Sequence, residues 1–239
     1  MGRVNVLAVS TFNAEGLALY GRRMMESFRQ NWSIPLRVYS EGWDGDVDLL
    51  SASPWLAAFK ERHAGRKFRD FRWDAVRFAH KVAAVCHAAR EDIDYLIWVD
   101  GDTFTHSPVT MADLRKMLPE GGQWIAWLDR TMAYPECGFY VINCRHPQHE
   151  RMIGTFEAMY AEDRLFSLPE FHDSHVLEHV VKTSGVATMS LSGAARKTSH
   201  PAINGPLGAF IDHMKGQRKT SGRTPARERV MPGGGAYWS

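Results

Sequence analysis

Short apolar segments alternate along the chain with longer segments in which apolar residues recur at helical spacing. The apolar, often β-branched runs predict strands at 4–10, 36–40, 95–99, 124–128, 138–143 and 186–191. Apolar residues that lie three and four positions apart predict helices at 17–32, 73–89 and 175–182. Because strands that alternate with helices are typical of layered α/β domains, we expect a mostly parallel central sheet flanked by helices.

The composition is that of one globular domain. The 239 residues are 44% hydrophobic and 23% charged, which excludes collagen-like, coiled-coil and wholly disordered chains. No CxxC pair occurs among the three cysteines, which favours a reducing compartment over a disulfide framework or structural zinc. No segment reaches about 18 consecutive apolar residues, so we expect no membrane span. The predicted location is cytoplasmic, in a bacterium or a phage-infected host cell.

Positive charge is concentrated near the C-terminus. The formal net charge is +2, yet residues 215–229 contain six Lys or Arg and one Glu. We therefore divide the chain into a domain at 1–219 and a basic, flexible tail at 220–239. The tail is interpreted either as solvated or as a contact to a polyanionic acceptor, such as DNA with hydroxymethylated bases or an anionic glycan.

A pair of carboxylates is the sharpest chemical signal. Asp100 and Asp102 follow the buried strand 95–99 and are separated by Gly101. Ligands in α/β sheets bind beyond the carboxyl ends of strands, so the position suits a site. Two neighbouring carboxylates repel each other unless a cation lies between them, and Mg²⁺ or Mn²⁺ accepts such oxygen ligands. The alternative is a polar turn that ends the strand.

Two basic residues on the helix before this strand are further candidates. Arg77 and Lys81 are four residues apart, so they share one helix face and could hold a diphosphate. The alternative is a solvated helix face. Histidines at 172, 175 and 179 are also spaced for one helix face, but we interpret them as pocket-lining or surface residues in preference to zinc ligands.

Several motifs, taken in order, resemble those of nucleotide-sugar glycosyltransferases with the GT-A fold. The Asp100–Asp102 pair is similar to their DxD motif. The pattern His213-x-x-Gly216-x-x-Lys219 resembles a C-terminal motif of the glycogenin-like (family 8) enzymes. Between them, the segment 136–143 is similar to the family's Asn-x-Gly strand, with Glu136 in place of Asn. The segment 171–177 occupies the place of the family's Asp-Gln-Asp motif and retains Asp173.

The resemblance implies a single Rossmann-like GT-A domain that transfers a hexose or pentose from a nucleotide-diphosphate sugar, with a UDP-sugar expected. It implies that Mn²⁺ or Mg²⁺ binds to Asp100, Asp102 and a histidine, either His213 or His200. It places the donor against Thr11, Asn13, Asp100, Gly216 and Lys219, and we expect the helix face with Arg77 and Lys81 to bind the donor as well. It assigns Glu136 and Asp173 to catalysis and leaves the acceptor open.

Two other functions compete with this interpretation. A metal-dependent nucleotidyltransferase or pyrophosphorylase would also use acidic metal ligands in an α/β domain. Such enzymes carry a glycine-rich basic loop after the first strand, and the segment 11–16, TFNAEG, is not such a loop. A non-enzymatic nucleic-acid-binding protein would explain the basic tail but would leave the carboxylate pair without a role.

Overall fold

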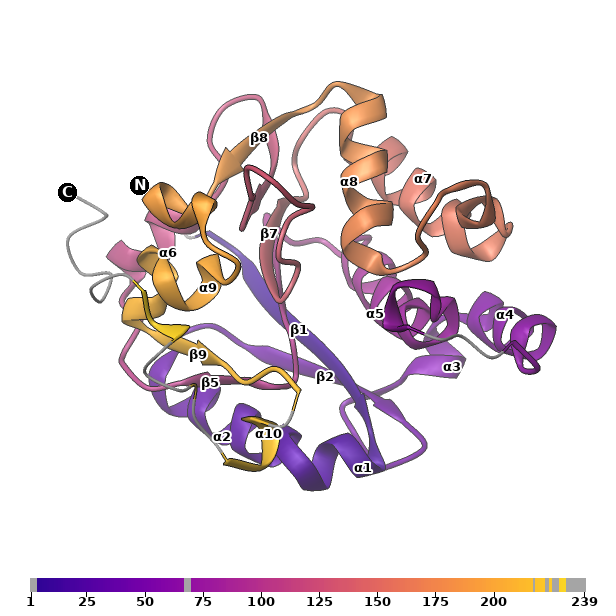
Figure 1. Cartoon of the computed structure of the whole chain (residues 1–239), viewed down its shortest axis with the longest axis horizontal. Helices are drawn as coiled ribbons and strands as arrows, with labels where there is room; N and C mark the ends of the chain where they lie inside the picture. Colours follow the sequence, from indigo (N-terminus) through magenta and orange to yellow (C-terminus); the bar gives the residue numbers. More distant parts are fainter. Residues whose placement is uncertain (1–3, 67–69, 217, 222–223, 225–227, 231–239) are drawn as a thin grey trace.

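A seven-stranded sheet lies between two layers of helices in the computed structural model of the chain (Figure 1). The structure describes residues 4–66, 70–216, 218–221, 224 and 228–230. The expected α/β class with a central, mostly parallel sheet is therefore confirmed. None of the helices among these residues is both long enough and apolar enough to cross a bilayer.

The sheet is parallel at every contact except those of one strand. Its strands, in chain order, are β1 (Val6–Asn13), β2 (Leu36–Glu41), β3 (Val47–Asp48), β4 (Tyr95–Val99), β6 (Gln123–Trp127), β7 (Phe139–Asn143) and β8 (Ala187–Ser190). Their order across the sheet is β3-β2-β1-β4-β7-β6-β8. Strand β7 runs antiparallel to both β4 and β6. Its first residues therefore lie beside the carboxyl end of β4.

Alternating side chains of the strands build one core on each face. In β1, Leu7 and Val9 belong to one core and Val6 and Ala8 to the other. The first core is covered by α3 (Leu49–Ala52), α4 (Pro54–His63), α5 (Ala75–Ala88), α7 (His149–Ala161) and α8 (Asp173–Ser184). The second is covered by α2 (Arg22–Asn31), α6 (Met111–Met117) and α9 (Pro201–Asn204).

The predicted elements agree with the observed ones except at their ends. Strand β1 continues to Asn13, and the first helical segment starts three residues early, with α1 (Ala14–Gly16) and a π-helical turn at Leu17–Gly21 before α2. Helices α4, α6 and α7 were not predicted. Two of them carry readable start signals, because α4 begins with Pro54 and α6 has a capping box at Thr110 and Asp113.

A second, two-stranded sheet joins residues that are far apart in the sequence. Strand β5 (Thr103–Thr105) pairs antiparallel with β9 (Ile211–His213), and Thr103 lies opposite His213. The backbone N–H of Met214 donates to the Asp102 carbonyl over 2.9 Å. This small sheet brings His213 beside Asp102, and it was not predicted because each strand has three residues.

Described residues beyond Lys219 contact the domain through Asp212 and Asn204. The Thr224 N–H and hydroxyl both donate to the Asp212 carboxylate, and Arg229 Nη2 lies 2.9 Å from Asp212 Oδ2. The Val230 N–H donates to Asn204 Oδ1 over 2.7 Å. Helix α10 (Arg218–Ser221) precedes these residues. The two remaining tail arginines, 223 and 227, lie outside the described residues, so the predicted flexibility of the tail stays a prediction.

We predict that Asp212→Asn lowers the free energy of unfolding by about 1.5–3 kcal/mol, because it removes charge-assisted hydrogen bonds. Burial alone would raise the pKa of Asp212, but the bonds from Thr224 and the Arg229 charge outweigh burial and lower it. The carboxylate therefore stabilises the fold above its ordinary pKa of 3.8, and this stability is lost as the pH falls below that value. Thermal unfolding from pH 7 to pH 3 should show that the difference in melting temperature between variant and wild type becomes smaller below about pH 4. A difference that stays constant over this range would contradict the role of the Asp212 carboxylate.

Candidate active site

The carboxylate pair lies in a tight turn beyond β4. The Asp100 N–H donates to the Gly138 carbonyl over 2.8 Å, and the Thr103 N–H donates to the Asp100 carbonyl over 3.0 Å. Trp98, two residues earlier, donates its indole N–H to Asp100 Oδ1 over 2.6 Å. These bonds fix both the backbone of the turn and one oxygen of the first carboxylate.

His213 joins the two carboxylates from β9. Its Nε2 lies 3.1 Å from Asp102 Oδ1 and 3.6 Å from Asp100 Oδ2. Each of the three side chains offers one ligand atom, and these atoms lie within 4.8 Å of one another. In the described part of the chain this is the one such group of His, Cys, Asp and Glu, so the structure favours His213 over His200. Two carboxylate oxygens and an imidazole nitrogen fit Mn²⁺ well and Mg²⁺ less well.

The charges of this group depend on each other. Burial alone would raise the pKa of Asp100, but Lys81 and His213 outweigh it and hold that pKa well below its usual range. Burial alone would likewise raise the pKa of Asp102, and His213 lowers it. For His213 both effects act in the opposite direction. Burial lowers its pKa, while Asp102 and Asp100 outweigh burial and raise it well above the ordinary value. The pair is therefore ionised, and its negative charge is available to a cation.

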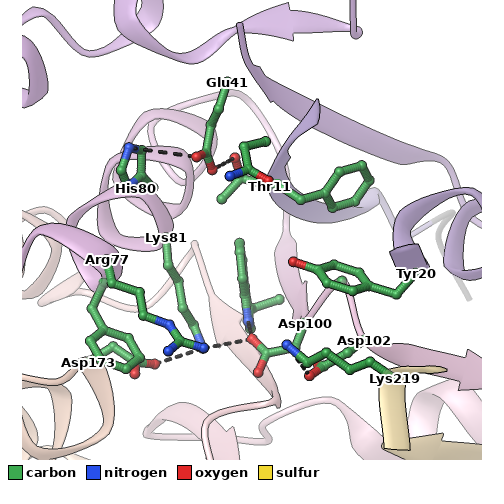
Figure 2. A pocket seen from close by; sticks show the side chains of 15 residues that line it. Thr11, Tyr20, Glu41, Arg77, His80, Lys81, Asp100, Asp102, Asp173 and Lys219 are labelled. Carbon is green, nitrogen blue, oxygen red and sulfur yellow. Dashed lines mark hydrogen bonds and ion pairs between the residues drawn. The ribbon is translucent and has the colours of Figure 1, made fainter. Parts of the chain in front are cut away.

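Lys81 is buried between two carboxylates. It extends from α5, and its Nζ lies 3.1 Å from Asp100 Oδ1 and 2.7 Å from Asp173 Oδ2 (Figure 2). It also donates to the Cys137 carbonyl. Burial alone would lower the pKa of Lys81, but Asp100 and Asp173 outweigh burial and raise it. Lys81 therefore carries a permanent charge that links α5, β4 and α8 at the site.

Two connected pockets meet at the carboxylate pair. The first has a volume of about 330 Å³ and lies between β1, α5 and the turn after β4. Its lining includes seven residues that the sequence assigned to donor binding or catalysis: Thr11, Asn13, Arg77, Lys81, Asp100, Asp173 and Lys219. The structure thus brings together residues from the two ends of the domain.

One end of the first pocket is a polar network of three side chains. The Thr11 hydroxyl donates to Glu41 Oε1 over 2.8 Å, and His80 Nε2 lies 3.6 Å from Glu41 Oε2. Burial lowers the pKa of His80, although Glu41 opposes this effect. Figure 2 shows these side chains at one end of the pocket and the carboxylates at the other. Asn13 Oδ1 accepts the Gly16 N–H over 2.7 Å and so also caps α1.

The second pocket has a volume of about 770 Å³ and adjoins the first at the carboxylates. It shares Asp100 and Asp102 with the first pocket. Its further lining includes Glu136, His213 and Gly216. Gly216 has a φ of +59°, a conformation that favours glycine.

Two cations face the carboxylates without being buried like Lys81. Lys219 Nζ lies 3.1 Å from Asp102 Oδ2 and 4.7 Å from the centre of the Tyr20 ring. Arg77 lines both pockets, and among the residues that the structure describes no carboxylate lies within ion-pair distance of it. Both side chains are placed to meet an anionic ligand.

Five further side chains lie at this site although the sequence predicted no role for them: Trp98, Tyr20, Glu41, His80 and Lys215. The signal for Trp98 was present, because residues two apart in a strand point to the same side and Trp98 precedes Asp100 by two. His80 lies on the same helix as Arg77 and Lys81, next to them in the sequence. Glu41 and Tyr20 carried no local signal, because tertiary packing alone brings them to the pocket.

We predict that Lys81→Met lowers the free energy of unfolding by about 3–5 kcal/mol, because it leaves buried carboxylates without a counter-charge. Adding Asp173→Asn should restore part of this loss, and a denaturant-based double-mutant cycle would measure the coupling. Exposed Lys116 provides the matched control, since Lys116→Met should change stability by less than about 0.5 kcal/mol. If the effects of Lys81→Met and Asp173→Asn on the free energy of unfolding were strictly additive, the two side chains would not be coupled and the ion pair would be contradicted.

Comparisons with known proteins support the fold. No family model and no curated protein matches the sequence. The apo structure of the bifunctional glycosyltransferase WbbM matches with a TM-score of 0.52 at 15% identity, over 80% of this chain and 39% of that chain. Mouse xyloside xylosyltransferase 1 and GlyE of Streptococcus pneumoniae match with TM-scores of 0.48 at 13% and 14% identity, over 79% of this chain and 85% and 45% of theirs. The WbbM match shows that the chain shares its fold with a glycosyltransferase, in agreement with the expected GT-A fold, while the family 8 detail stays a prediction.

Proposed function

We propose that the protein is a metal-dependent glycosyltransferase that takes a hexose or pentose from a nucleotide-diphosphate donor. The observation that carries this proposal is the group Asp100, Asp102 and His213, placed where two pockets meet on a glycosyltransferase fold. A donor has a nucleoside, a diphosphate and a sugar, and an acceptor must reach the sugar from another side. Two pockets that share one cation-binding group suit these parts.

The first pocket suits the nucleoside and the diphosphate. Thr11, Glu41 and His80 offer polar atoms at the end away from the carboxylates, where a base and a ribose would need hydrogen-bond partners. Arg77 and Lys219 lie nearer the carboxylates, where a diphosphate would lie. We propose a UDP-sugar as the donor, as the resemblance to family 8 enzymes implies.

The chain's own residues organise the transfer. The bond between the anomeric carbon and the diphosphate oxygen breaks, a bond to the acceptor oxygen forms, and the acceptor hydroxyl gives up its proton to the leaving diphosphate. A bound Mn²⁺ or Mg²⁺ would neutralise the charge that develops on the leaving diphosphate. Asp173 lines both pockets next to Lys81, so we propose that it contacts the transferred sugar. Arg77 and Lys219 would hold the diphosphate in place as it leaves.

The acceptor belongs in the second, larger pocket. Tyr134 and Phe71 are among its lining residues and provide aromatic surface of the kind that stacks on sugars. A glycan is therefore the acceptor class that the pocket suits. DNA remains the alternative through the basic tail, although Arg229 pairs with Asp212 and Arg218 pairs with Glu228.

One experiment distinguishes the candidate functions. The full chain is incubated with a panel of nucleotide sugars and Mn²⁺, and release of the free nucleoside diphosphate is followed. Slow release from one donor is expected, because glycosyltransferases transfer sugars to water in the absence of an acceptor. A pyrophosphorylase would release a nucleoside triphosphate only when pyrophosphate is added, and a nucleic-acid-binding protein would release nothing. Either of the last two results would contradict the proposal.

We predict that Asp102→Asn reduces Mn²⁺-dependent release of nucleoside diphosphate by about 100-fold or more, because it replaces a charged metal ligand with a neutral one. Thermal unfolding should show that the variant is folded. Asp92→Asn makes the same chemical change at a carboxylate whose side chain is 93% exposed, and should keep full activity. Wild-type activity of Asp102→Asn, or activity that persists in EDTA, would contradict the metal assignment.

Lys219 is expected to affect both metal binding and donor binding. Its ammonium lies on Asp102 in the donor-free protein, so it competes with a cation for that carboxylate. Lys219→Met should therefore raise donor-free Mn²⁺ affinity about fivefold and raise the donor KM about tenfold. Lys182→Met, at a surface ion pair with Glu178, is the control and should change neither value. A donor KM that stayed unchanged or fell would contradict the contact of Lys219 with the diphosphate, and a Mn²⁺ affinity that stayed unchanged or fell would contradict the competition for Asp102.

A further inference from the structure

The imidazole of His213 is held from the side that faces away from the carboxylate pair. Its Nδ1 lies 3.2 Å from Glu136 Oε1, while Nε2 faces Asp102 and Asp100. An ionised carboxylate can only accept a hydrogen bond, so Nδ1 carries a proton and donates it to Glu136. By the same argument Nε2 carries a proton toward Asp102 in the metal-free protein, so a bound cation would displace the Nε2 proton while the bond from Nδ1 to Glu136 persists.

Glu136 is itself fixed by several partners. Its side chain is 1% exposed, and its Oε2 accepts the Ala202 N–H over 3.1 Å. Lys215 Nζ lies 2.5 Å from Oε1 and supplies the opposite charge. A carboxylate held in this way cannot rotate toward a substrate, but it can keep an imidazole ring in one orientation.

Gly138 provides the space in which the same ring lies. A Cβ atom at position 138 would lie 2.3 Å from Cε1 and 2.7 Å from Nδ1 of His213, which is closer than any side chain could approach. The Gly138 carbonyl also accepts the Asp100 N–H over 2.8 Å. The short segment 136–138 therefore makes three contacts. Glu136 binds the imidazole nitrogen Nδ1, Gly138 lies against the imidazole ring, and the Gly138 carbonyl binds the backbone of Asp100.

We propose that Glu136 and Gly138 are positioning residues for the metal-binding His213. Glu136 sets the orientation and tautomer of the imidazole, and Gly138 lets the ring approach the aspartates. This inference rests on the proposed function, because it assumes that a divalent cation binds to Asp100, Asp102 and His213. It gives Glu136 an indirect role in place of the direct catalytic one that the resemblance implies.

The position of the imidazole should affect Mn²⁺ binding more than Mg²⁺ binding. Imidazole nitrogen is a good ligand for Mn²⁺, whereas Mg²⁺ prefers oxygen ligands. A displaced imidazole would leave the two aspartates in place. Loss of the positioning residues should therefore weaken Mn²⁺ binding more than Mg²⁺ binding, and a general loosening of the fold would weaken both alike.

The test measures Mn²⁺ binding directly, by the electron paramagnetic resonance signal of free Mn²⁺ in titrations of the full chain. Mg²⁺ affinity follows from competition. Glu136→Gln and Gly138→Ala should each weaken Mn²⁺ binding by about 10–100-fold, the usual effect of removing a partner of a metal ligand, and should change Mg²⁺ affinity less than about threefold. Asp212→Asn is the matched control, because it loosens β9 next to His213 without touching the imidazole.

The outcomes separate this inference from the proposed function. If wild-type protein binds no Mn²⁺, or if Asp102→Asn leaves binding unchanged, the metal site itself is wrong. If wild type binds Mn²⁺ through Asp102 but Glu136→Gln binds it as tightly, the positioning role alone is overturned. Equal weakening of Mn²⁺ and Mg²⁺ binding, or weakening no greater than in Asp212→Asn, would also overturn it. Should Gly138→Ala fail to fold, Glu136→Gln decides the question.

Discussion

Mutual repulsion of carboxylates beyond the end of β4 is the constraint on which the site depends. Four of them gather there, each paired with a cation: Asp100 and Asp173 with Lys81, Asp102 with His213 and Lys219, and Glu136 with Lys215. Burial would protonate such groups if they stood alone. Because the cations keep Asp100, Asp102 and Glu136 charged, the group can accept a divalent ion together with an anionic diphosphate.

The topology of the sheet explains why these groups meet. Strand β7 is antiparallel to β4, so the start of β7 lies at the end of β4 and delivers the segment 136–138 to Asp100. The β5–β9 pair delivers His213, and α10, which follows β9, delivers Lys219. Helix α5 delivers Lys81 from the opposite layer. Each element supplies one part of the charge balance, so the site requires the whole domain to be folded.

Local patterns predicted six of the seven strands of the central sheet, all but β3, and the carboxylate pair, because strand periodicity and the turn after 95–99 are encoded in neighbouring residues. The resemblance to family 8 enzymes added His213 and Lys219, which the structure places beside Asp102. The pairing of Lys81 with Asp173 and the contact of Glu136 with His213 could not be predicted. Both contacts join residues more than seventy positions apart, and local sequence patterns do not indicate such long-range contacts.

The central claim is that one cation is bound at once by His213 and by the donor diphosphate. Electron–nuclear double resonance of the Mn²⁺-loaded protein with a non-hydrolysable nucleotide-sugar analogue tests this claim most directly. The account predicts a ¹⁴N coupling from one imidazole and ³¹P couplings from the diphosphate in the same sample, with the ¹⁴N coupling lost in His213→Gln. Phosphorus couplings without any protein nitrogen, or nitrogen without phosphorus, would contradict it.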